Sequence, residues 1–164
     1  MERARELLAK ELGDGAKQVL RLALTALARR EYGRVELERK LQRDLRASER
    51  SSDVAQVLDR LQARGLLSDE RMAQSFVRTR AMRYGRLRIE HELLRRGLQP
   101  STIAEALVPA PDELTVAQAL WQRKFGQVAT TMQERSRQGR YLAARGFDSS
   151  IVARILSGAV GRKA

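Results

Sequence analysis

The helical pattern of this chain is clearest in residues 65–98, which read GLLSDERMAQSFVRTRAMRYGRLRIEHELLRRGL. Apolar side chains recur in it at helical spacing, first as Met72 and Phe76 and again as Ile89 and Leu93. Glycines close both helical segments, and serine followed by aspartate precedes the first as an N-cap signal. The stretch therefore predicts two short helices joined by a turn.

The same pattern occurs elsewhere in the chain at fixed distances. The tripeptide Tyr32-Gly33-Arg34 stands 52 positions before Tyr84-Gly85-Arg86. Arg96-Gly97-Leu98 likewise stands 49 positions before Arg145-Gly146-Phe147. Apolar triplets follow the same 49-residue period, as Val54, Val57 and Leu58, then Ile103, Ala106 and Leu107, then Val152, Ile155 and Leu156. A recurrence of about 50 residues indicates tandem structural repeats.

We therefore expect an all-α protein of three tandem three-helix repeats, in which core is buried between neighbours. Such an array predicts an elongated, curved body with long accessible faces. The predicted parts are an arm or leading helix at 1–15 and repeats at 16–67, 68–110 and 111–164.

Composition supports helices and restricts the chemistry. Aromatic residues make up only 4% of the 164 residues, which disfavours a sheet-rich fold. The absence of cysteine excludes disulfides, thiolate catalysis and cysteine-bound metal, and a single histidine excludes a histidine cluster. No apolar run is long enough to span a bilayer or to form the core of a signal peptide. We expect a cytoplasmic protein.

No motif predicts catalysis. The sequence holds neither a phosphate-binding glycine loop nor a His-Glu-x-x-His pattern, and its serines have no base nearby in sequence. His91 lies between two glutamates whose side chains leave the helix on other faces, so it is interpreted as a solvated residue. The acidic pairs Asp69-Glu70 and Asp112-Glu113 stand at helix starts, where they favour the helix dipole. We expect no enzyme activity, no catalytic or metal-binding residues and no cofactor.

Charge is the informative property. The chain has 32 basic against 20 acidic residues, a net charge of +12, and all but five of the basic residues are arginines. Arginine offers a planar fork that suits phosphates and carboxylates. This balance predicts a polyanionic partner, either nucleic acid, an acidic protein groove or a complex of both.

The basic residues are densest in the middle repeat, where seven arginines between Arg78 and Arg96 face only Glu90 and Glu92. An exposed helix face that is simply solvated is the alternative interpretation. Tyr32 and Tyr84 share one repeat position, which favours packing at a corner between helices over stacking on bases. The predicted partner-binding residues are Arg78, Arg80, Arg83, Arg86, Arg88, Arg95, Arg96, Arg34, Arg39, Lys40, Arg137, Arg140 and Arg145.

The segments that carry these features resemble the RecX family of bacterial regulatory proteins. The resemblance rests on ALARREYGRVELERKL at 26–41, on the 65–98 stretch and on the Arg145-Gly146-Phe147 turn with the helix after it. Together they cover about three-quarters of the chain in the expected order. The sequence departs from the family pattern in the loop 43–52, where a glycine turn is usual, and in its looser third repeat.

The resemblance implies a small helical modulator of the RecA recombinase. Such proteins bind RecA, chiefly as its filament on single-stranded DNA, and suppress its ATP hydrolysis, strand exchange and coprotease activity in recombination, repair and the SOS response. We expect a monomer with RecA and the RecA filament as partners, and direct contact with single- or double-stranded DNA stays open. One alternative is a helix-turn-helix DNA-binding protein that places Arg86–Arg96 in the major groove. Another is a helical scaffold for an acidic or RNA-bound protein.

Overall fold

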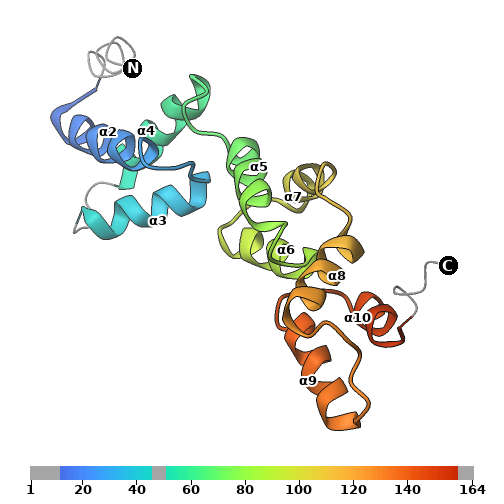
Figure 1. Ribbon diagram of the computed structural model, residues 1–164. Helices are drawn as coiled ribbons and strands as arrows, with labels where there is room; N and C mark the ends of the chain where they lie inside the picture. The colour runs from blue at the N-terminus through green and yellow to red at the C-terminus, as the bar shows by residue number, and fades with distance from the viewer. Residues whose placement is uncertain (1–11, 46–50, 159–164) are drawn as a thin grey trace. The chain divides into compact units, whose positions relative to one another are not determined.

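The computed structural model describes residues 12–45 and 51–158. Within these ranges the chain forms nine helices and no strand, arranged as three sets of three in chain order (Figure 1). This confirms the predicted all-α class. The helices are α2 (Asp14–Leu27), α3 (Arg34–Asp44), α4 (Ser51–Ala63), α5 (Asp69–Arg80), α6 (Arg86–Arg95), α7 (Pro100–Leu107), α8 (Glu113–Lys124), α9 (Met132–Ala143) and α10 (Ser149–Leu156).

The chain divides into two compact units. One comprises the residues up to Ala73 together with Arg96–Gln99, and the other comprises Gln74–Arg95 and the residues from Pro100 onward. The repeat boundaries given above stay a prediction. Most of the predicted arm, residues 1–11, lies outside the described residues, as does part of the loop 43–52.

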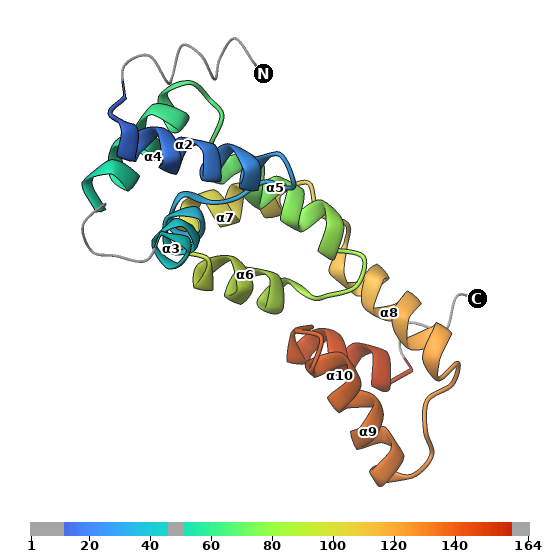
Figure 2. The same ribbon diagram turned by 90° about the vertical axis from the view of Figure 1, so that its left-hand side faces the viewer.

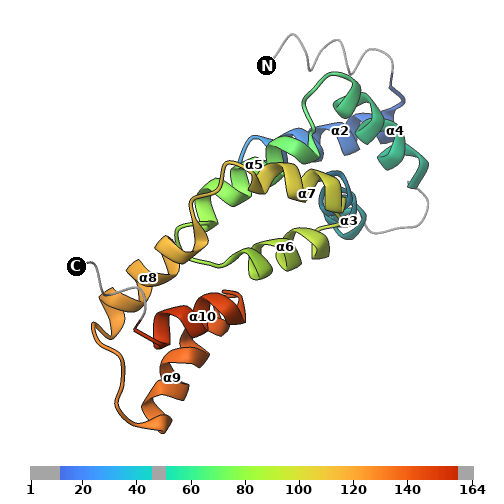
Figure 3. The same ribbon diagram turned by 90° about the vertical axis from the view of Figure 1, so that its right-hand side faces the viewer.

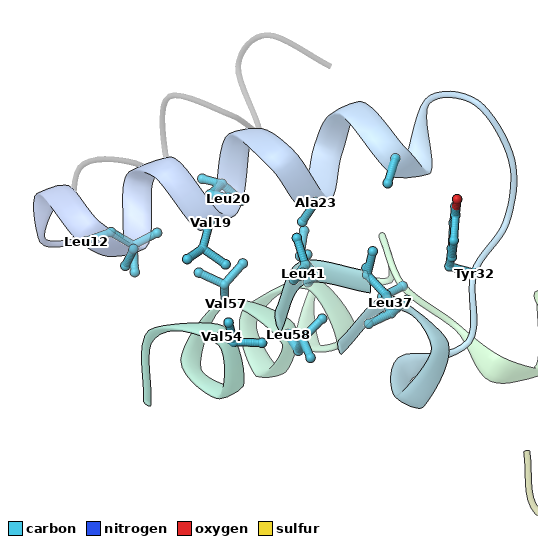
Figure 4. Close-up of a cluster of buried hydrophobic side chains, with 14 residues drawn as sticks. Leu12, Val19, Leu20, Ala23, Tyr32, Leu37, Leu41, Val54, Val57 and Leu58 are labelled. Carbon is cyan, nitrogen blue, oxygen red and sulfur yellow. The ribbon is translucent and has the colours of Figure 1, made fainter. Parts of the chain in front are cut away.

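The core of the first unit lies between α2, α3 and α4 (Figure 4). The spacing of Leu20, Leu24 and Leu27 alone would predict one buried face of α2, but Leu24 and Leu27 are only half-buried, at the edge of the core. The buried face of α2 is instead formed by Ala16, Val19, Leu20, Ala23 and Ala26. The alanines on this face let α2 approach the neighbouring helices closely. Leucines and valines cover this face from the opposite side, as Leu37, Leu41, Val54, Val57, Leu58 and Leu61.

A second core holds α8, α9 and α10 together, and Figures 2 and 3 show these helices gathered with the long connection from α8 to α9. Trp121 is buried there, and its indole Nε1–H donates to Oε1 of Gln138 at 3.0 Å. The amide of Gln138 in turn donates to the carbonyl of Gln127 in that connection, also at 3.0 Å. Gln138 is the one buried polar side chain of the described residues, and these two bonds satisfy it.

Two equivalent joints link successive repeats. We define the first joint as Gly33–Glu36, Asp69 and Arg96–Leu98, all within the first unit. The backbone N–H of Arg34, at the start of α3, donates to Oδ1 of Asp69 at 2.7 Å. Gly97 has a φ of +87°, and a side chain there would meet Val35 at 2.5 Å. Glycine is thus required at this position both for its backbone conformation and for its lack of a Cβ atom.

The second joint repeats this arrangement one repeat later and comprises Gly85–Arg88, Glu113 and Ala144–Gly146, all within the second unit. The N–H of Arg86, at the start of α6, donates to Oε1 of Glu113 at 2.8 Å. The N–H of Gly85 donates to the carbonyl of Arg145 at 2.9 Å. Gly146 has a φ of +81°, and a Cβ atom there would lie 2.3 Å from that of Arg88. The repeated tripeptides therefore match in contacts as well as in sequence.

Candidate partner-binding surface

The arginines of the middle repeat differ in how far the chain itself uses them. Arg86 and Arg88, in the first turn of α6, each pair with a glutamate one turn later, Glu90 at 2.8 Å and Glu92 at 3.0 Å. Arg88 also donates to the carbonyl of Ala144 at 3.2 Å, and its Cζ lies 4.2 Å from the ring centroid of Tyr84. The side chain of Arg88 thus contributes to the second joint, and that of Arg86 is paired within α6.

Two further arginines of the candidate set are held in place. Arg80 has its Cζ 5.4 Å from the ring centroid of Phe76 and 5.9 Å from that of Tyr84, within reach of a cation–π interaction. Arg96 is half-buried in the first joint, where its Nη1 lies 2.6 Å from Oε1 of Glu36. The glutamates of the middle repeat are therefore not the only acids that pair its arginines.

Glu36 lies between two guanidinium groups. Arg30 reaches the same carboxylate at 2.8 Å, beside the bond from Arg96. Burial by itself raises the pKa of Glu36, but the hydrogen bond from Arg30 and the charges of Arg96 and Arg30 outweigh it, so the net pKa lies below the ordinary value. The carboxylate is ionised and fixes both arginines within the first unit.

Arg78 and Arg83 are the arginines of the middle repeat that stay available. Arg78 lies in the last turn of α5 and Arg83 in the turn before α6, and both are exposed. Neither side chain has an ion pair or hydrogen bond with another described residue. Met82, between them, is 62% exposed. An uncompensated pair of guanidinium groups beside a large apolar side chain suits a partner with negative charge.

The candidates of the first repeat are mostly engaged within the chain. Arg34 pairs with Asp59 at 2.7 Å and donates to the amide oxygen of Gln62. Lys40 pairs with Asp44 at 2.8 Å. Arg39, like Arg95 of the middle repeat, is exposed and also interacts with another group of the chain.

The candidates of the third repeat divide in the same way. Arg145 is half-buried, with its Cζ 3.8 Å from the ring centroid of Tyr141. Arg137 and Arg140 lie on α9, are exposed and make no ion pair within the described residues. Of the thirteen predicted residues, the available side chains are therefore Arg78, Arg83, Arg137 and Arg140.

The tyrosines shared between repeats pack against arginines. Tyr32 is only 9% exposed, and the Cζ of Arg30 lies 3.6 Å from its ring centroid. Tyr84 is half-buried beneath Arg88. A base would have to displace these guanidinium groups to reach the ring faces, so the corner-packing interpretation fits the geometry better than stacking does.

The second joint also bears on the helix-turn-helix alternative. A recognition helix reads base edges with residues near its N-terminus. The start of α6 is instead held within the chain, since the N–H of Gly85 donates to Arg145, the N–H of Arg86 donates to Glu113 and the side chain of Arg88 donates to Ala144. The side chains of Arg86 and Arg88 are exposed, but their pairing with Glu90 and Glu92 competes with contacts to bases.

A hollow of about 390 Å³ lies beside Arg78 and was not predicted from the sequence. It is lined by one face of α5 together with residues at the end of α7 and after it, namely Gln74, Val77, Arg78, Ala81, Met82, Ala106, Pro109, Ala110 and Pro111. Alanines at helical spacing beside two prolines are the only sequence signal for it, and that signal also fits an ordinary core.

Two further findings concern ligands and membranes. The described ranges hold no group of three or more histidine, aspartate or glutamate side chains placed to bind a metal ion. Every helix in the described part of the chain is too short or too polar to cross a bilayer.

Known proteins match this chain over most of its length. Family models for the second and third three-helix domains of RecX match residues 68–107 and 111–156. The Regulatory protein RecX of Pseudomonas savastanoi pv. phaseolicola is 47% identical over 90% of this chain and 96% of its own length. That of Ralstonia pickettii is 41% identical, over 84% of this chain and 85% of its own length.

Solved structures show the same fold. The crystal structure of RecX from Lactobacillus salivarius has a TM-score of 0.74 at 22% identity and covers 92% of this chain and 100% of its own. A second crystal structure of a regulatory protein RecX has a TM-score of 0.70 at 22% identity, over 88% of this chain and 72% of its own. With two domain models and relatives above 40% identity in agreement, the chain belongs to the RecX family of regulatory proteins.

Proposed function

We propose that the chain binds the RecA recombinase, chiefly as its filament on single-stranded DNA, and lowers its ATP hydrolysis, strand exchange and coprotease activity. It acts by binding and not by catalysis, in recombination, DNA repair and the SOS response. Membership of the RecX family supports this role.

The observation that supports a particular contact surface is the exposed pair Arg78 and Arg83, which no carboxylate of the described chain neutralises. A RecA filament on single-stranded DNA carries the phosphates of that strand, and exposed guanidinium groups bind phosphate as well as carboxylate oxygens. Arg137 and Arg140 of the third repeat offer the same chemistry. Arginines that already hold the joints, such as Arg88 and Arg96, are assigned to the fold.

A charge reversal tests this surface. The variant Arg78→Glu/Arg83→Glu is compared with the control Arg21→Glu/Arg64→Glu. The control changes the net charge by the same amount, at exposed arginines of the first repeat. Binding of the labelled proteins is measured against RecA filaments on an oligo-dT strand and against the naked strand. We expect the first variant to bind filaments at least about tenfold more weakly, a loss of about 1.4 kcal/mol, and the control to stay within about twofold.

Two results would count against the proposal. Equal weakening by both variants would mean that net charge alone governs binding and that Arg78 and Arg83 form no specific contact. Tighter binding to the naked strand than to the filament, by the unaltered protein, would favour a DNA-binding protein that acts without RecA.

A further inference from the structure

The hollow beside Arg78 is a gap in the packing of the middle repeat. In the first repeat α2 packs along α4, and in the third α8 packs against α10. Helices α5 and α7 have no comparable contact. Ala106 of α7 occupies the repeat position of Val57 and Ile155, which are both buried core residues with larger side chains. The shorter side chain of Ala106 fills less of the space between α7 and α5.

The hollow has an aliphatic lining with one stiff wall. Val77, Ala81 and Ala106 are buried and supply an aliphatic floor. Pro109 and Pro111, in the loop that leads from α7 to α8 (Figure 3), have restricted φ angles and stiffen one wall. Met82 at the rim is flexible and exposed, as suits a side chain that adapts to an inserted group. A volume of about 390 Å³ lies within the range of small binding sites, about 300–1,000 Å³.

Charge at the hollow selects the occupant. Arg78 is the one ionisable side chain among the residues that line it, and it makes no ion pair with the described chain. An inserted apolar group would fill the hollow above its aliphatic floor, and a carboxylate beside that group would neutralise Arg78. Single-stranded nucleic acid fits less well, because its bases stack on aromatic side chains and none lines this hollow.

We propose that the hollow is a docking site for an acidic protein segment that carries a large aliphatic or aromatic side chain beside its carboxylates. The apolar side chain inserts between α5 and the Pro109–Pro111 loop, and a carboxylate binds the guanidinium of Arg78. The inference rests on the proposed function for the identity of the partner, a RecA subunit, but not for the chemistry of the site.

The test uses the full chain labelled with nitrogen-15 and three probes followed by NMR. The first probe is the acidic hexapeptide DELFED with blocked ends, the second replaces its Leu and Phe with alanine, and the third is an oligo-dT strand. We expect the first peptide to shift amide signals of 77–82 and 106–110, and the alanine peptide to bind at least tenfold more weakly. Equal affinity of the two peptides, or dT binding at these same amides more tightly than the first peptide, would overturn the proposal.

Variants locate the contact. Ala110→Leu, in the loop, should fill the hollow and abolish peptide binding, and Arg78→Ala should weaken it at least fivefold even if the leucine variant fails to fold. Arg123→Ala is the matched control, an exposed arginine in the last turn of α8 that has no ion pair within the described residues, and it should leave binding unchanged. Equal effects of the two alanine variants would refute docking at Arg78. Peptide binding without any effect on RecA would remove the proposed function and leave this site standing.

Discussion

The contact between Glu113 and the start of α6 gives a quantitative test of how the repeats are joined. Helix α6 follows Gly85, which has no side chain to cap it, and the N–H of Arg86 finds its acceptor 27 residues away at Oε1 of Glu113, at 2.8 Å. The perturbation is Glu113→Ala, which leaves this N–H without its acceptor. The companion Glu113→Gln keeps an acceptor oxygen and removes only the charge.

The expected loss of stability has two parts. Removal of a side-chain cap costs about 1 kcal/mol. Glu113 also lies in the first turn of α8, where a negative charge stabilises the helix by about 0.3–1 kcal/mol. We therefore expect Glu113→Ala to lower the free energy of unfolding by about 1.3–2 kcal/mol and Glu113→Gln by about 0.3–1 kcal/mol.

The assay is urea unfolding followed by the fluorescence of Trp121, the sole tryptophan, which is buried in the same compact unit as this joint. Glu105→Ala is the matched control, since it removes an exposed acidic side chain of α7 that has no partner within the described chain. It should change the free energy of unfolding by less than about 0.5 kcal/mol. A loss below that limit for Glu113→Ala would refute the joint as described. A glutamine variant as unstable as the alanine variant would show that charge, and not the bond, is responsible.

Three further predictions concern the rest of the fold. Gly97→Ala should lower the free energy of unfolding by about 2–4 kcal/mol, because this position combines a positive φ with a clash on Val35. Gly65→Ala, at a φ of +65° but with open space around the new Cβ atom, should lower it by only about 1–2 kcal/mol. Urea unfolding followed by circular dichroism compares the two variants. Gln138→Leu should lower the free energy of unfolding by about 1–3 kcal/mol, because it leaves the buried indole N–H of Trp121 without an acceptor, and urea unfolding measures this loss. Glu36 has a lowered pKa in the folded chain, so its contribution to stability is complete above its ordinary pKa of 4.5 and is lost as the pH falls through the folded pKa. Glu36→Gln should therefore flatten the loss of stability between about pH 5 and pH 3. An unchanged slope of unfolding free energy against pH would contradict this.

The sequence predicts the helices well because their signals are local. Leu37 and Leu41 fall on one face at helical spacing and are fully buried, and Gly97 ends its helix with a positive φ as expected. Trp121 follows Ala117 at helical spacing, and both are buried. Such features depend on spacing within one or two turns, which the sequence displays directly.

The joints could not be predicted from the same signals. Asp69 and Glu113 were explained completely by the dipoles of their own helices, so nothing in the sequence required the bonds to Arg34 and Arg86. These partners lie 35 and 27 residues away, and only the packing of one repeat on the next brings them together.

The candidate surface was predicted as a region and not as residues. Counting charges identifies the arginine-rich middle repeat, but it cannot separate Arg83, which is available, from Arg88, whose contacts are a carboxylate, a carbonyl and a ring. Contacts of an arginine with an aromatic ring or a backbone carbonyl involve no acidic residue, so a count of charges does not detect them. The hollow beside Arg78 was missed for a related reason, since Ala106 is equally compatible with a closed core.

The proposed action of this chain on the RecA filament can be tested by one titration. ATP hydrolysis by RecA on single-stranded DNA is measured at moderate salt while the unaltered chain is added at ratios well below one molecule per RecA subunit. Inhibition at these ratios is the predicted result, because simple coating of free DNA by a basic protein needs comparable amounts of both. Unchanged hydrolysis at every ratio, together with tight binding of the chain to naked DNA, would contradict the claim.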